Sequence, residues 1–171
     1  YFSIAFADDE TARAVEPQAP GISARFEAMR MLSEAGIPTG ISVAPIIPGL
    51  NEQAIPEILS RAKQAGATSA TWSLLRLPGH VEQVFIERLC EAFPDRVSKI
   101  MHRIREVRGG ALSDAEFFSR HHGRGTYWRC IEQLFELGRR RAGFMSDELP
   151  VPQTFRRPTG QQSLFCEEES L

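Results

Sequence analysis

At the centre of the chain lies the stretch Val43-Ala44-Pro45-Ile46-Ile47-Pro48-Gly49-Leu50-Asn51-Glu52. It completes an apolar run that starts at Ile41, and Pro48-Gly49 ends that run. Prolines are excluded from the interior of a helix, whereas Ile and Val favour a strand that is buried on both faces. The stretch therefore predicts a buried parallel strand and a tight loop in which Gly49 lets a ligand approach the backbone. Ligands of parallel sheets bind at the carboxyl ends of the strands, where this loop would lie.

Strand and helix patterns alternate on both sides of this stretch. Strands are predicted at residues 1–6, 41–47 and 70–75, and helices at 12–15, 22–35, 55–65, 81–93, 97–107 and 126–142. Asn51 is expected to cap the helix that follows it, and Cys90 to be a small buried hydrophobe. The order β–α–β–α–β with short loops indicates parallel strands joined by right-handed crossovers.

The composition bounds the class of protein. The 171 residues are 42% hydrophobic and 25% charged, which is typical of a globular domain with a real core. We find no signal peptide and no apolar run near the ~20 residues of a membrane helix, so we expect a cytoplasmic protein without membrane contact. The three cysteines are far apart and indicate neither a disulfide framework nor a metal site. The adjacent histidines His121 and His122 do not have metal-ligand spacing either.

The central stretch also carries a family resemblance. Pro45, Ile47, Gly49 and Glu52 match the GxIxGxxE element of radical S-adenosylmethionine (SAM) enzymes, with Pro45 in place of the first Gly. The longer string from Ala35-Gly36-Ile37-Pro38 through Asn51 resembles the branch of that superfamily that includes spore photoproduct lyase. An ordinary barrel strand with a tight turn is the alternative interpretation.

The resemblance covers roughly residues 1–144 and implies an α/β fold, the second half of a partial parallel (β/α) TIM-like barrel with a helical C-terminal extension. Three regions are expected: half of the barrel with three β/α units at 1–80, a helical, basic extension at 81–144, and a flexible tail at 145–171. The family holds its [4Fe–4S] cluster on a CxxxCxxC loop, and this sequence contains no such triplet. We therefore expect the carboxyl-terminal part of a longer enzyme, or a remnant of one, that is inactive by itself.

In the family, a [4Fe–4S] cluster cleaves SAM reductively, and the resulting radical abstracts hydrogen from a substrate. The resemblance implies that Ser3 meets the ribose of SAM, while Ile47 and Gly49 form an apolar floor for adenine. Arg25 is expected either to pair with the methionyl carboxylate or to be a solvated helix arginine. Arg76, at the end of a strand, is either a contact for SAM or a substrate phosphate, or a rim arginine with a carboxylate partner. No residue is assigned as a catalytic acid, base or radical relay.

Basic residues concentrate in one part of the chain. Residues 96–141 hold 11 basic and 5 acidic side chains, although the whole chain has a net charge of −2. Arginines interleaved with aromatic residues suit a phosphate backbone with exposed bases, so DNA is a candidate partner. A solvated basic helix face is the alternative. The candidate nucleic-acid contacts are Arg103, Arg105, Arg108, Arg120 and Arg124.

The C-terminal tail contains a second candidate interaction motif. Gln161-Gln162-Ser163-Leu164-Phe165 resembles the Gln-Leu-Ser-Leu-Phe peptide by which bacterial repair proteins bind the DNA sliding clamp. Gln161, Leu164 and Phe165 would be the contacting residues, with Leu164 and Phe165 as the apolar anchors. The alternative is that Leu164 and Phe165 pack back on the parent domain.

Two rival functions follow from the same residues. The first is a non-enzymatic remnant or interaction module that binds DNA or the sliding clamp. The second is a barrel enzyme that uses the same strand ends for a phosphorylated metabolite. The resemblance favours a radical SAM enzyme, lyase-like and acting on nucleic acid, with its cluster ligands outside this chain.

Overall fold

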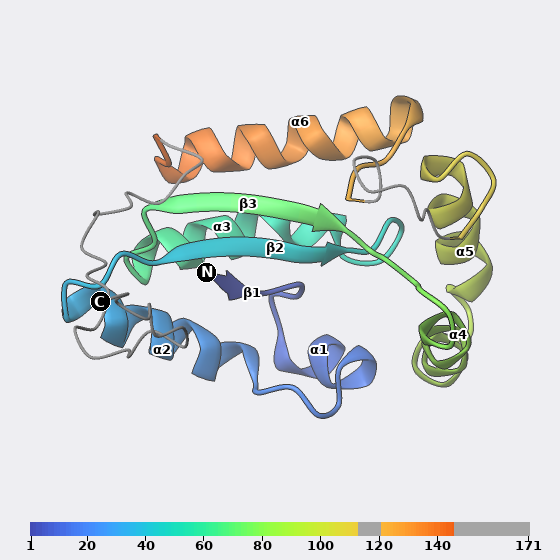
Figure 1. Ribbon diagram of the computed structural model, residues 1–171, viewed down its shortest axis with the longest axis horizontal. Helices are drawn as coiled ribbons and strands as arrows, with labels where there is room; N and C mark the ends of the chain where they lie inside the picture. The colour runs from blue at the N-terminus through green and yellow to red at the C-terminus, as the bar shows by residue number, and fades with distance from the viewer. Residues whose placement is uncertain (113–120, 146–171) are drawn as a thin grey trace, which may run out of the picture.

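The computed structural model describes residues 1–112 and 121–145, and Figure 1 shows how their elements are arranged. The elements follow in the order β1 (Phe2–Ser3), α1 (Asp9–Val15), α2 (Ile22–Glu34), β2 (Gly40–Ile46), the 3-10 turn η1 (Glu52–Ala54), α3 (Ile55–Gln64), β3 (Ser69–Leu74), α4 (Val81–Ala92), α5 (Val97–Val107) and α6 (Gly125–Ala142). These bounds confirm the predicted alternation of strands and helices. The strand predicted at residues 1–6 is the exception, because only Phe2–Ser3 form β1.

The three strands form one parallel sheet in the order β1-β2-β3. Ser42 of β2 is the register partner of Ser3 in β1 and of Thr71 in β3. The register shifts between Val43 and Ile46, at an irregularity in β2. The apolar run that was predicted to be a buried strand is thus the central strand of the sheet, with a neighbour on each side.

The prediction of a half barrel with a helical extension is wrong for the part of the chain that the structure describes. The sheet is a small open one with three strands and six α-helices around it, and its outer strands β1 and β3 remain at the edges. A parallel barrel closes with about eight staggered strands, each long enough to pair on both sides. Two residues of β1 and six of β3 supply no such closure.

Helices α3 and α6 lie side by side along the sheet (Figure 1). Trp72 of β3 contacts α6, with its ring centroid 5.1 Å from that of Trp128 and 6.5 Å from that of Phe135. Trp72 is the register partner of Val43, so both side chains point to this helix-covered face. The opposite face carries the register partners Ser3, Ser42 and Thr71, whose side chains are exposed or half-buried.

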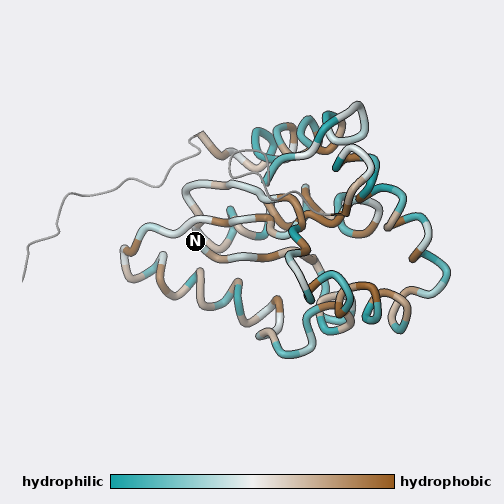
Figure 2. Tube along the Cα trace, turned by 45° about the vertical axis from the view of Figure 1, so that its right-hand side comes forward, coloured by the Kyte–Doolittle hydropathy of each residue, from teal (hydrophilic) through white to brown (hydrophobic). Residues whose placement is uncertain are grey.

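The regions 1–80 and 81–144, which the sequence analysis predicted as separate, share one hydrophobic core. Buried side chains of β2, α3, α5 and α6 belong to the same cluster, and the helices alternate between hydrophilic and hydrophobic residues along their length (Figure 2). Cys90 is exposed, contrary to the prediction, because α4 buries Phe85 and Leu89 instead. None of the described helices combines the length and apolar character needed to cross a bilayer.

Candidate ligand site at the carboxyl ends of the strands

A pocket of about 260 Å³ lies where the three strands end. Ser3 is the last residue of β1, Ala44 and Pro45 belong to the irregular end of β2, and Ser73 and Leu74 close β3. Ser3, Ala44 and Ser73 alternate onto the sheet face that lies opposite Trp72. The full described lining is Ser3, Glu16, Ala44, Pro45, Ser73, Leu74 and Arg76.

Arg76 brings a positive charge to this pocket. Its Nε is buried and makes no hydrogen bond within the described residues. A buried guanidinium nitrogen without an acceptor is costly, and the pocket that Arg76 lines is where an anionic ligand can supply one. Arg76 and Ser3, which were both predicted to lie at a strand-end ligand site, line the same pocket. Their contact with a ligand stays a prediction.

Arg25 is bound to the protein around this pocket instead of lining it. Its Nη1 donates to the carbonyl oxygen of Ser3 at 2.8 Å, and its Nε donates to that of Pro20 at 2.9 Å. Its Nη2 pairs with Oε2 of Glu16 at 3.1 Å, and the side chain of Arg25 is only 15% exposed. Arg25 therefore holds Glu16 at the pocket wall, and the carboxylate of Glu16 is the acidic group of the site.

A serine and a histidine from distant parts of the sequence meet at the end of β3. The Oγ of Ser73 lies 3.0 Å from Nδ1 of His121. The same two segments are also joined by a backbone hydrogen bond, in which the amide of Leu74 donates to the carbonyl oxygen of His121 at 3.0 Å. Ser73 thus lines the pocket on one side and touches an imidazole on the other.

The loop after β2 is held by Asn51, which is 4% exposed. Its Nδ2 donates to the carbonyl oxygens of Ala5 and Pro45 at 2.8 and 2.9 Å, and its Oδ1 accepts from the amide of Ile47 at 2.7 Å. The predicted capping role is wrong, since the side chain makes no cap hydrogen bond to η1. Instead, Asn51 joins the loop to the segment that follows β1.

Gly49 and Ile47 are buried and are not among the described residues that line the strand-end pocket. Gly49 has a φ of +86°, and a Cβ there would lie 3.3 Å from the Cα of Ile100 in α5. Arg96 donates to the carbonyl oxygen of Gly49 at 3.0 Å. The glycine therefore allows α5 to approach the loop closely. The sequence had predicted that a ligand would approach the backbone at this position.

Glu52 and Tyr127 complete the anchoring of this loop. Oε2 of Glu52 accepts from the amide of Gly49 at 3.0 Å, while Oε1 accepts from the hydroxyl of Tyr127 at 2.5 Å. Burial raises the pKa of Tyr127 well above its usual range, and the hydrogen bond to Glu52 raises it further. The Glu of the GxIxGxxE-like element is thus bonded to its own loop and to α6.

The candidate nucleic-acid arginines do not form one exposed patch. Arg108 is 8% exposed and donates to the carbonyl oxygens of Leu75 and His122 at 2.7 and 3.3 Å. Arg103 pairs with Glu106 at 2.6 Å and lies over the ring of Tyr127. The side chains of Arg105 and Arg124 are exposed. Arg120 lies outside the described residues, as do the clamp-motif residues Gln161, Leu164 and Phe165.

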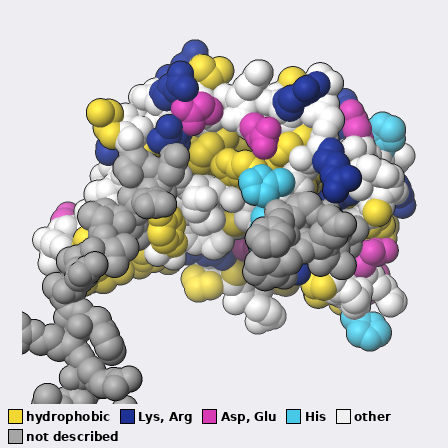
Figure 3. Space-filling model, turned by 45° about the horizontal axis from the view of Figure 1, so that its top comes forward, with side chains coloured by type: hydrophobic (Ala, Val, Ile, Leu, Met, Phe, Trp, Pro, Cys, Tyr) yellow, Lys and Arg dark blue, Asp and Glu magenta, His cyan; other side chains and the backbone are white. Residues whose placement is uncertain are grey.

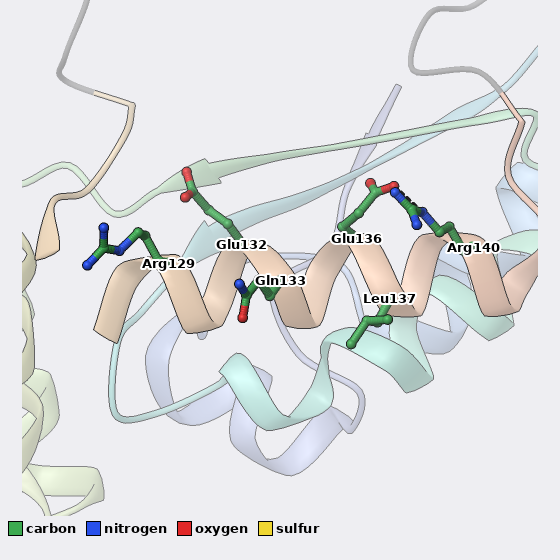
Figure 4. A pocket seen from close by; sticks show the side chains of 6 residues that line it. All are labelled: Arg129, Glu132, Gln133, Glu136, Leu137 and Arg140. Carbon is green, nitrogen blue, oxygen red and sulfur yellow. Dashed lines mark hydrogen bonds and ion pairs between the residues drawn. The ribbon is translucent and has the colours of Figure 1, made fainter. Parts of the chain in front are cut away.

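Two larger concavities lie along α6. One, of about 600 Å³, follows the helix surface between Arg129 and Arg140 (Figure 4). Hydrogen bonds from Arg139 and Arg140 lower the pKa of Glu136 in this surface to about 2. The other is a groove of about 460 Å³ between β3 and α6, with hydrophobic side chains at its floor and charged ones around it (Figure 3). Many of these charges pair within the helix, as on a solvated helix face.

Sequence reasoning missed Glu16, Ser73 and His121. Ser73 precedes the predicted strand end by two residues, and strand alternation could have placed it on the same face as Ser3. No local pattern links Ser73 to a histidine 48 positions later. Across the described ranges, no group of three or more His, Cys, Asp or Glu side chains could hold a metal ion.

Comparison with known proteins finds similarity to mycobacterial proteins that are named uncharacterized. Uncharacterized protein Mb2609c of Mycobacterium bovis is 32% identical over 99 residues, and the same holds for Uncharacterized proteins Rv2578c and MT2655 of two Mycobacterium tuberculosis strains. The match covers 57% of this chain and 29% of the length of each relative. No family model matches the chain, and no solved structure matches it. The chain is thus similar to part of a longer mycobacterial protein.

Proposed function

We propose that this chain supplies part of the SAM site of a radical SAM enzyme of the spore photoproduct lyase-like type. The pocket that joins Ser3 and Arg76 at the carboxyl ends of three parallel strands is the observation that supports this proposal. The GxIxGxxE-like element supports it as well, because Glu52 bonds to the loop that follows β2. The cluster ligands are proposed to come from outside this chain.

The charges of the pocket suit the two ends of an amino acid. Arg76 offers a guanidinium for the methionyl carboxylate of SAM, and Glu16 offers a carboxylate for its ammonium group. Arg25 is proposed to orient Glu16, and the hydroxyl of Ser3 to meet the ribose. When bound, the cluster and SAM supply the radical, whereas these residues bind SAM and orient it.

Calorimetric titration of the full chain with SAM tests this assignment. Replacing Arg76 by Gln should weaken SAM binding by about tenfold or more, because a charge-assisted hydrogen bond is lost. Glu16→Gln should weaken it less, since Arg25 would keep the side chain in place. Arg88→Gln is the matched control, because Arg88 is an exposed arginine that pairs with Glu91 on α4. An equal affinity of the Arg76 variant and this control would contradict the proposal.

The second part of the proposal is a nucleic-acid substrate. Arg105 and Arg124 are the residues that we propose to contact its phosphates. Their side chains are exposed and make no hydrogen bond or ion pair with the described residues. The affinity for single-stranded DNA falls as the salt concentration rises. Replacing both arginines by Gln should make the slope of log affinity against log salt less negative by roughly one to two. Fluorescence anisotropy at several salt concentrations measures this slope, with Arg88→Gln as control. An unchanged slope would favour the alternative in which a phosphorylated metabolite is the ligand.

We also propose a cytoplasmic location and the sliding clamp as a partner, on the basis of the motif at residues 161–165. A labelled peptide spanning residues 159–171 should bind the clamp, and replacing Leu164 and Phe165 by Ala should cost about 2 kcal/mol or more. Anisotropy compares the two peptides. Equal signals would show that the motif is a coincidence and would leave the interaction-module alternative resting on DNA alone.

A further inference from the structure

The contact between Ser73 and His121 gives the strand-end pocket a hydroxyl group whose direction depends on a proton. Ser73 has one hydroxyl hydrogen, and its Oγ lies 3.0 Å from Nδ1 of His121. In the neutral tautomer that carries its proton on Nε2, Nδ1 accepts that hydrogen, so Ser73 presents only lone pairs to the pocket. When this ring takes up a second proton, Nδ1 donates to Ser73, whose own hydrogen is then released. The one other partner among the described residues is the carbonyl oxygen of Leu74, at 3.5 Å and thus at the limit of a hydrogen bond.

We propose that the strand-end pocket takes up an acidic ligand group, a carboxylate or a phosphate, together with one proton that the Ser73–His121 pair holds. The protonated pair adds a hydroxyl donor to the guanidinium of Arg76, which lines the same pocket. The unprotonated pair directs lone pairs at the anion. Binding of the anion and protonation of the ring therefore favour each other, and by linkage the affinity rises as the pH falls.

Several charged side chains lie around the pocket and the histidine and contribute to the electrostatic potential there. Arg76 and Glu16 line the pocket, and Glu16 is paired with Arg25. Arg108 of α5 is bound to the carbonyl oxygens of Leu75 and His122, next to the histidine. Glu132 of α6 accepts from the indole of Trp128. His122 is a second imidazole beside the pair, with its ring centroid 4.9 Å from that of Trp72. The contribution of the Ser73–His121 pair is therefore the part of the coupling that is lost when Ser73 is replaced.

The inference rests on the proposal that this pocket is a ligand site, but it does not require SAM or an iron–sulfur cluster. The full chain can therefore be titrated with two simple probes, L-methionine for a carboxylate and sulfate for a phosphate-like oxyanion. Both probes keep the same charge between pH 6 and 8. Chemical shifts of the histidine ring signals report binding, the apparent affinity and the pH at which His121 titrates.

The wild-type protein should bind at least one probe about five- to tenfold more tightly at pH 6 than at pH 8, as expected when one proton is coupled to binding. Bound probe should also move the titration of His121 to higher pH. Ser73→Ala should remove most of this pH dependence, whereas Arg76→Gln should weaken binding at both pH values. Ser42→Ala is the matched control, because Ser42 is a half-buried serine on the same sheet face outside the described pocket lining.

The outcomes separate this inference from the proposed function. Tighter binding of L-methionine assigns a carboxylate ligand, and tighter binding of sulfate assigns a phosphate; either supports the proposal if Ser73→Ala loses the pH dependence. An equal pH dependence in wild type and Ser73→Ala would overturn the proton coupling while leaving an Arg76-dependent SAM site intact. If neither probe binds at either pH, the anion site itself is refuted.

Discussion

Tyr127 donates its hydroxyl hydrogen to Oε1 of Glu52 at 2.5 Å, and this bond joins α6 to the loop that follows β2. The other oxygen of Glu52 accepts from the amide of Gly49 at 3.0 Å. The guanidinium carbon of Arg103 in α5 lies 4.1 Å from the centre of the Tyr127 ring. Residues of the predicted helical extension thus stabilise the loop that was predicted to be the centre of the ligand site.

Replacing Tyr127 by Phe should lower the free energy of unfolding by about 1–2 kcal/mol, because a hydrogen bond to a carboxylate is lost from a half-buried position. Urea denaturation measures the change. Glu52→Gln and the double variant complete a thermodynamic cycle in which the two changes should be less than additive, because both residues share the bond. Strict additivity would show that the contact contributes nothing to stability.

Replacing Gly49 by Ala should cost about 2–3 kcal/mol. The backbone at Gly49 has a positive φ, and the new methyl group would lie 3.3 Å from the Cα of Ile100. Gly79→Ala is the matched control, because its φ of +54° is strained in the same sense but no atom lies within 4 Å of the added Cβ. The control should lose only about 1 kcal/mol. Equal losses in the two variants would mean that α5 does not press on the loop.

Replacing Asn51 by Ala should lower the free energy of unfolding by about 3 kcal/mol, because buried backbone groups of Ala5, Pro45 and Ile47 lose their partner. Gln53→Ala, in an exposed position two residues later, should change it by less than about 0.5 kcal/mol. Thermal and urea unfolding can both measure the difference. A small effect at Asn51 would indicate that water replaces its amide in the loop.

The ion pairs of Glu136 with Arg139 and Arg140 should add a small acid-sensitive contribution to stability. Because these hydrogen bonds lower the pKa of Glu136 to about 2, the contribution is present above the unfolded value near 4.5 and is lost as the pH falls toward 2. Glu136 is partly exposed, so solvent screening limits the contribution to about 1 kcal/mol or less. Unfolding of Glu136→Gln between pH 2 and 6 should therefore depend less on pH than that of wild type. Identical pH profiles would contradict this expectation.

Element types and their order could be predicted from the sequence because they depend on local periodicity. The spacing of Ile55, Ile58, Leu59 and Ala62 predicts α3, and all four side chains are buried. The side chain of Asp8 accepts from the amide of Thr11 at 2.6 Å and so caps α1, as an aspartate before a helix is expected to do. Local periodicity did not predict correctly which side chains of α4 are buried. Cys90 is exposed, whereas its neighbour Leu89 lies in the buried stripe of the helix. A shift of one residue changes which side chain a helix buries.

The sequence by itself determined a parallel sheet whose central strand is the apolar run ending at Ile46, because proline, glycine and β-branched residues restrict the backbone locally. It also indicated that Ser3 and Arg76 lie at the carboxyl ends of strands. Only the tertiary structure decided that the sheet is open and that α5 covers Gly49. The structure also decided that Ser73 meets His121. Those contacts join residues 48 or more positions apart, and they arise from the way helices pack on the sheet, which no local pattern records.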